Sequence, residues 1–114
     1  MQPVGHKKRV TVVVPTLGNP LLGACIASLE RQTFKEMEIV VVDNSGRSAA
    51  RHALPPDTRA RLIANRENLG FGGAVNQGFR ECPAEFLATL NDDAEASPDW
   101  LKRLVEAMLL ATPK

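Results

Sequence analysis

The chain has 114 residues, an ordinary length for one compact domain, and its 14 basic and 13 acidic residues leave a formal net charge of +1. A nearly neutral chain has no bulk attraction for a polyanion or an anionic membrane surface. Its one Trp, four Phe and no Tyr offer few platforms on which the bases of a single strand could stack, so we expect no nucleic-acid partner.

The first half of the chain alternates between apolar runs and helical spacing. The β-branched run at residues 10–14 stops at Pro15 and has the composition of a strand that is covered on both faces. Asn19 and Pro20, a capping residue before a proline at the first helical position, predict a helix that extends to about residue 32. Residues 38–42 repeat the strand pattern and end at Asp43, and residues 46–58 are expected to form a mobile loop.

The second half continues the alternation. Residues 61–64 form a weaker strand, residues 73–80 a glycine-rich helix, and residues 86–90 a fourth strand. Ser97 then caps a helix that has Pro98 at its first position. The expected apolar face of this last helix consists of Leu101, Leu104, Val105, Met108 and Leu109.

This order of elements predicts an α/β fold. Alternating strands and helices give a mostly parallel, Rossmann-like sheet that is flanked by helices. We expect the domain to run over residues 10–114, after an N-terminal tail at residues 1–9.

The two cysteines and the hydropathy pattern predict a cytoplasmic protein. Cys25 and Cys82 have no metal-type spacing, and we expect free thiols in a reducing compartment. The basic N-terminus has no apolar stretch long enough for a signal peptide, and no run approaches the ~20 residues of a membrane span. Membrane association would therefore have to come through an acceptor substrate, a partner or missing sequence.

Polar clusters follow three of the predicted strands, at the edge where parallel sheets bind ligands. They lie at residues 15–19, 43–45 and 91–93. Asp43 could accept hydrogen bonds from a ribose diol or a nucleobase, or it could cap the turn that follows it. In the last cluster Asp93 could bind Mg²⁺ or Mn²⁺. The alternative is an Asp-rich turn before a helix that binds no ligand. Alternating side-chain directions would place Asn91 and Asp93 on one side, with Asp92 opposed.

The segment at residues 68–79, NLGFGGAVNQGF, is rich in glycine. A glycine-rich turn that opens a helix can direct backbone N–H groups at a diphosphate, and a flexible turn is the alternative. The dinucleotide fingerprint would need glycine at Val75, and no Gly-Lys-Ser/Thr of a P-loop follows. A dinucleotide-dependent oxidoreductase is therefore disfavoured.

In this order, VTVVVPT, SLERQTFKEMEIVVVDNS, NLGFGGAVNQGF and FLATLNDDA closely resemble the nucleotide-binding part of family-two glycosyltransferases, which have the glycosyltransferase A fold. The resemblance runs from about Val10 to Lys114. The glycine-rich segment with its Asn-x-Asp ending is similar to the branch that includes rhamnosyl and galactofuranosyl transferases of bacterial surface polysaccharides.

The resemblance implies a set of nucleotide contacts. Pro15 and Thr16 would border the nucleotide pocket, and Asp43 would bind the base or ribose. Asn68 and Gly70 would lie against the nucleotide.

The resemblance also implies a support and a metal ligand. Asn76 would support the glycine-rich loop and its helix. The Asp-x-Asp metal motif of the family falls on Asn91-Asp92-Asp93, which leaves Asp93 as the ligand of Mg²⁺ or Mn²⁺ and Asn91 as a neutral contact to the nucleotide.

The function that the resemblance implies is inverting transfer of a sugar from a nucleotide-diphospho-sugar to a hydroxyl of a glycan or lipid-linked acceptor. The family's general base and acceptor-binding elements lie further along the chain. We therefore expect a truncated chain, half of an enzyme, that binds nucleotide with little or no turnover. The alternative is a truncated, non-catalytic nucleotide-binding or oligomerisation module, which would form a homodimer.

Overall fold

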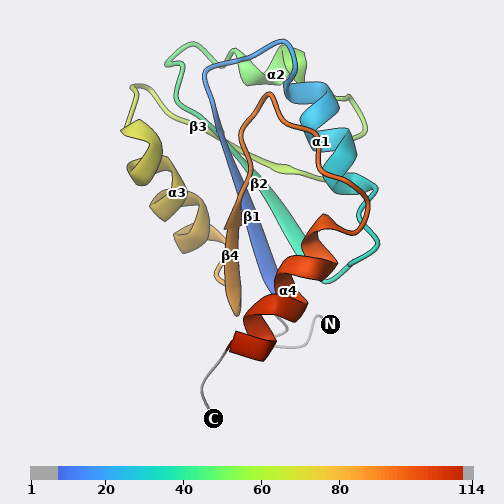
Figure 1. Ribbon diagram of the computed structural model, residues 1–114. Helices are drawn as coiled ribbons and strands as arrows, with labels where there is room; N and C mark the ends of the chain where they lie inside the picture. Colours follow the sequence, from blue (N-terminus) through green and yellow to red (C-terminus); the bar gives the residue numbers. More distant parts are fainter. Residues whose placement is uncertain (1–7, 112–114) are drawn as a thin grey trace, which may run out of the picture.

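The computed structural model describes residues 8–111, and most of the expected N-terminal tail lies outside the described residues, as do residues 112–114 (Figure 1). Four strands form one parallel sheet in the order β3-β2-β1-β4. The strands are β1 (Val10–Thr16), β2 (Met37–Asp43), β3 (Arg61–Ala64) and β4 (Phe86–Thr89). The helices are α1 (Leu22–Glu30), α2 (Ala50–Ala53), α3 (Gly70–Glu81) and α4 (Trp100–Ala111). The predicted α/β fold with a parallel sheet is confirmed.

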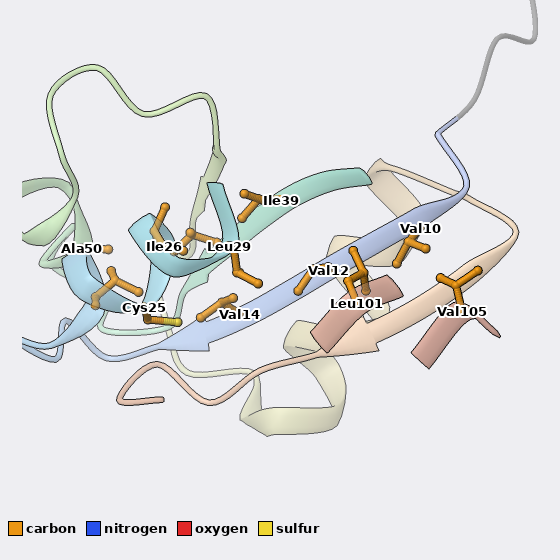
Figure 2. Close-up of a cluster of buried hydrophobic side chains, with 12 residues drawn as sticks. Val10, Val12, Val14, Cys25, Ile26, Leu29, Ile39, Ala50, Leu101 and Val105 are labelled. Carbon is orange, nitrogen blue, oxygen red and sulfur yellow. The ribbon is translucent and has the colours of Figure 1, made fainter. Parts of the chain in front are cut away.

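Helices cover both faces of the sheet (Figure 1). On one face, Val10, Val12 and Val14 of β1 pack in a buried cluster with side chains of α1, α2 and α4 (Figure 2). On the other face, Val13 packs with residues of β2 and α3. Because β1 is covered on both sides, its apolar run shows no polar alternation.

Helix α3 lies very close to β1. A Cβ atom at Gly78 would come within 2.8 Å of Val13 Cγ1, a separation that real side chains do not adopt. Gly78 is therefore fixed by packing, and it seats the middle of α3 against the central strand.

The register of β4 decides what lies beside the end of β1. Val10 pairs with Phe86 and Val13 with Thr89, so partners are 76 residues apart. The same offset continues past the last ladder pair and brings Asp92 opposite Thr16. Thr16 is itself paired with Asp43 on the other side, so the ends of three strands meet.

Several local features differ from the sequence-based expectations. Helices α1 and α4 begin at Leu22 and Trp100, two residues after the prolines expected at their first positions. The segment at residues 46–58, expected as a loop, contains the single turn of α2. Helix α3 begins at Gly70, three residues before its expected start. On α4 only Leu101 and Val105 are buried, while Leu104 and Leu109 are exposed. Across residues 8–111, no helix has the length and apolar character needed to cross a bilayer.

Candidate functional site

A cavity of about 620 Å³ opens at the carboxyl end of the sheet, at the top in Figure 1. It is bounded by the loop after β1, the residue after β2, the start of α3 and the turn after β4. The lining consists of residues 15–20, Asn44, Asn68, Gly70, Phe71 and Asp92. The cavity therefore lies where a parallel sheet is expected to bind a ligand. Of the residues assigned to the site from the sequence, Pro15, Thr16, Asn68 and Gly70 line it.

A hydrogen-bonded link joins the loop after β1 to the turn after β4. The Thr16 hydroxyl donates to Asp92 Oδ2 at 2.7 Å and accepts from the backbone N–H of Gly18 at 2.9 Å. Asn19 adds a longer bond, from its side-chain nitrogen to Asp92 Oδ1 at 3.5 Å. The Asp92 carboxylate is thus held at the cavity wall by two side chains of the opposite loop.

Residues 91–93 follow β4 in a turn, in which the Ala94 N–H donates to the Asn91 carbonyl oxygen at 3.0 Å, and their exposure alternates. Asp92 is half-buried and lines the cavity, whereas Asn91 and Asp93 are exposed and lie outside its lining. The proposed metal ligand Asp93 and the proposed nucleotide contact Asn91 stay predictions. Sequence reasoning had left Asp92 without a role, because alternation alone does not tell which side faces the cavity.

Cys25 lies beneath this turn, where its thiol donates to the Asn91 carbonyl oxygen at 3.4 Å. Burial, followed by the nearby carboxylates of Asp92, Asp93 and Glu95, raises the pKa of the Cys25 thiol to about 11. A protonated, buried thiol is a poor nucleophile, so Cys25 acts as a packing residue. Both cysteines are free and buried, as expected for thiols.

Asp43 serves as a cap in the structure. Its side chain has no exposed surface, and its two oxygens accept from the backbone N–H groups of Ser45 and Ala50, each at 2.8 Å. Burial alone would raise the pKa of Asp43, but the bonds from Ala50 and Ser45 and the charge of Arg47 outweigh it and lower the pKa. Asp43 does not line the cavity, whereas its neighbour Asn44 does. A bond from Asp43 to a base or ribose stays a prediction, and it would require the buried carboxylate to become accessible to the ligand.

The start of α3 forms one wall of the cavity. Gly70 has φ +77°, a conformation that favours glycine, and its N–H donates to Asn68 Oδ1 at 2.8 Å. The N-cap residue Leu69 makes no side-chain cap bond. Asn68 satisfies the Gly70 N–H, and the N–H groups that follow Gly70 have no side-chain cap.

Three amide side chains behind this wall were missed by sequence reasoning. Asn44 donates to the Gly70 carbonyl oxygen, and Asn65 links Asn44 to Gln77 of α3. Asn76, which the resemblance placed as the support of the loop, is exposed, and the adjacent Gln77 makes the supporting bonds instead. The sequence offers no signal for this, because the three amides come from separate elements.

Comparisons with known proteins connect this arrangement to a family. The sequence profile described as Glycosyl transferase family 2 matches residues 11–111. The chain is 42% identical over 83 residues to the succinoglycan biosynthesis protein ExoO of Rhizobium meliloti, covering 71% of this chain and 24% of that protein. It is 30% identical over 104 residues to the GalNAc(5)-diNAcBac-PP-undecaprenol beta-1,3-glucosyltransferase of Campylobacter jejuni, covering 86% of this chain and 34% of that protein. The chain thus spans about a quarter to a third of the length of these relatives.

A solved structure supports the same relationship. The mannosyltransferase PcManGT from Pyrobaculum calidifontis, in complex with GDP-Man and Mn²⁺, superposes with a TM-score of 0.74 and 26% identity, over 96% of this chain and 34% of that one. The four-stranded parallel sheet is thus the sheet of a glycosyltransferase A fold. Because the family profile extends over nearly all of its length, the chain belongs to glycosyl transferase family 2.

Proposed function

We propose that the cavity binds the diphosphate of a nucleotide-diphospho-sugar together with Mg²⁺ or Mn²⁺. In the full-length enzyme the sugar is transferred, with inversion, to a hydroxyl of a glycan or lipid-linked acceptor in the synthesis of a polysaccharide. The observation that carries this proposal is the position and charge of the cavity. It lies at the carboxyl ends of the strands, and Asp92 is the one acidic or basic residue among the described residues that line it.

This charge pattern limits how a diphosphate can bind. No Lys or Arg stands among the described lining residues, so the negative charge of a diphosphate is not met by a basic side chain. Beyond Gly70, whose N–H is held by Asn68, the first turn of α3 supplies backbone N–H groups and the positive end of a helix dipole, which favour an anion. Asp92 opposes the anion unless a cation lies between them. The binding of a diphosphate is therefore expected to depend on a divalent cation.

The side chains available to coordinate a metal ion are few, so the phosphates of the substrate would complete its coordination. Among the described residues, no group of three or more His, Cys, Asp or Glu side chains could hold a metal ion by itself. Mg²⁺ and Mn²⁺ commonly bind through one or two carboxylates, with water and substrate phosphates completing the shell. Asp93 would be the protein ligand, and Asp92 would face the same charge from the cavity wall. When bound, the cation supplies charge stabilisation for the departing diphosphate.

The remaining proposed roles are contacts between residues of this chain and the nucleotide. Thr16 and Pro15 border the ligand, and Asn68 and Gly70 form the wall against which the nucleotide lies. Asn91 and Asp43 are proposed contacts to the nucleotide, with Asp43 directed at the base or ribose. The proposal assigns donor binding to this chain, and the general base that activates the acceptor hydroxyl is not among the assigned residues.

Isothermal titration calorimetry tests the proposal. UDP, GDP and dTDP are each titrated into the protein in the presence of Mn²⁺ and again in EDTA without Mn²⁺. We expect at least one of the three to bind only with Mn²⁺. Replacing Asp93 with Ala should weaken that binding about tenfold or more, because a charged ligand of the cation is lost. Asp57→Ala is the matched control, since Asp57 is an exposed acid in the loop before β3.

Asp43→Ala belongs in the same series and should also weaken binding if Asp43 contacts the base or ribose. Equal affinities for the wild type, Asp93→Ala and Asp43→Ala would contradict the proposed site. Binding that is unchanged by EDTA would contradict the proposed role of the cation.

A further inference from the structure

A chain of amide hydrogen bonds connects the middle of α3 to the cavity wall. Gln77 and Asn65 form a reciprocal pair, in which each side-chain nitrogen donates to the other's oxygen at 2.8 Å. The Asn65 nitrogen also donates to Asn44 Oδ1 at 2.9 Å. Asn44 in turn donates to the Gly70 carbonyl oxygen at 3.2 Å. Side chains that follow β2 and β3 are thereby joined to Gly70 at the start of α3 and to Gln77 in its middle.

This chain of amide hydrogen bonds, together with Asn68, holds the peptide groups on either side of Gly70. The Gly70 carbonyl is held by Asn44, and the Gly70 N–H is held by Asn68. Gly70 has φ +77° and no neighbouring atom within 4 Å of a Cβ position, so packing alone does not determine its conformation. The amide bonds are the contacts that set the orientation of the first turn of α3.

The body of α3 does not need these bonds to dock on the sheet. Ala74 is buried in the cluster with Val13, and Gly78 lies in close contact with Val13. The effect of the amide pair is therefore expected to be local to the start of the helix. Asn65 and Gln77 are half-buried and do not line the cavity, so they have no direct contact with a ligand there.

We infer that Gln77 and Asn65 are positioning residues, which act through Asn44 to hold the Gly70 turn in the conformation that receives a nucleoside diphosphate. This inference rests on the proposed function of the cavity. Without Gln77, the Asn65 oxygen loses its donor and the Asn65 side chain is free to turn away from Asn44. The Gly70 peptide then samples orientations in which the N–H groups of the first turn no longer converge on one ligand.

The test compares Gln77→Ala with Arg80→Ala, a matched control at an exposed position on the same helix. Each variant is titrated with whichever of UDP, GDP and dTDP the wild type binds in Mn²⁺, at a temperature where every variant is folded. A ¹⁵N-labelled sample of each variant without ligand gives the backbone amide resonances of Gly70, Gly72 and Gly73.

We expect Gln77→Ala to raise the dissociation constant about tenfold and to shift these glycine resonances, with Arg80→Ala changing neither. The exchanged pair Asn65→Gln with Gln77→Asn keeps both amides and their combined length, and it should restore most of the lost affinity. A purely structural role would lower the melting temperature and leave the affinity of the folded protein unchanged.

Two failures are distinguishable. If the wild type binds a nucleotide and Gln77→Ala binds it equally well, the inference is wrong and the proposed function stands. If the wild type binds none of the probes, the proposed function fails. The glycine resonances alone then test whether the amide chain positions the Gly70 turn. Glycine resonances that do not move in Gln77→Ala would then overturn the positioning role, and shifts of Gly70, Gly72 and Gly73 that Arg80→Ala does not produce would support it.

Discussion

At the scale of single residues, Asp43 is a buried carboxylate whose charge is stabilised by the backbone. Its oxygens accept from the N–H groups of Ser45 and Ala50. The pKa of Asp43 is lowered in the folded state, although burial alone would raise it. A carboxyl group whose folded pKa is depressed contributes stability above its unfolded pKa of about 4. That contribution is lost as the pH falls through the folded pKa.

Replacing Asp43 with Asn is therefore expected to lower the free energy of unfolding by about 2 kcal/mol at pH 7, because an amide has one acceptor oxygen in place of two. The difference from the wild type should shrink as the pH falls below about 4, because the unfolded wild type binds a proton at Asp43 before the folded protein does at its lower pKa. Urea unfolding of both proteins at pH 7 and at pH 3 measures it. A difference that stays constant with pH would show that the charge of Asp43 does not stabilise this fold.

Residues 91–93 show how far the sequence determines a site. From the sequence alone, strand-like alternation predicts that the Asp92 side chain points to the opposite side from those of Asn91 and Asp93. Which of the two sides faces the cavity depends on the pairing of β4 with β1, where one offset of 76 residues brings Asp92 to Thr16. The burial of one face specifies the register of a strand, so the side that faces the cavity follows only once β4 is paired with β1.

At the scale of elements, α3 carries glycines with opposite roles. Gly78 has no room for a side chain, because Val13 Cγ1 lies 2.8 Å from its Cβ position. Gly72 has no neighbouring atom within 4 Å of its Cβ position. Alanine is a better helix former than glycine by about 1 kcal/mol, so the two positions separate propensity from packing.

We expect Gly72→Ala to raise the free energy of unfolding by up to about 1 kcal/mol and Gly78→Ala to lower it by about 1–3 kcal/mol. Val13 is β-branched and buried in the central strand, so it cannot move aside. Chemical denaturation of both variants beside the wild type measures the two signs. A stabilising Gly78→Ala would contradict the close packing of α3 on β1.

The elements with strong local signals were predicted well. The β-branched runs located β1 and β2, and β3 has the predicted bounds of residues 61–64. The start of α3 was missed because Gly70, Gly72 and Gly73 weaken the helical pattern that the tertiary structure imposes. The four-residue α2 was missed because a single turn leaves no periodic pattern to detect.

At the scale of the whole molecule, the alternation of elements predicted the parallel sheet and the edge at which its polar residues gather. It did not predict which of those residues share a cavity. Asp43 is a buried cap and Asp93 is exposed, and neither lines the cavity, whereas their neighbours Asn44 and Asp92 do. In both clusters the cavity is lined by the sequence neighbour of the residue that was assigned to the ligand, and the ligand contacts of Asp43 and Asp93 stay predictions. The amide chain that reaches Gln77 is likewise a property of the assembled fold.

The central claim is that the cavity at the carboxyl end of the sheet binds a nucleoside diphosphate. Amide NMR of the ¹⁵N-labelled chain, titrated with UDP, GDP and dTDP in Mg²⁺, tests it most directly. We predict that at least one of the three shifts the resonances of Thr16, Gly18, Asn44, Gly70 and Phe71, and leaves those at the opposite end of the sheet, around Lys35, unchanged. Spectra that none of the three changes, or shifts centred on Lys35, would contradict the account.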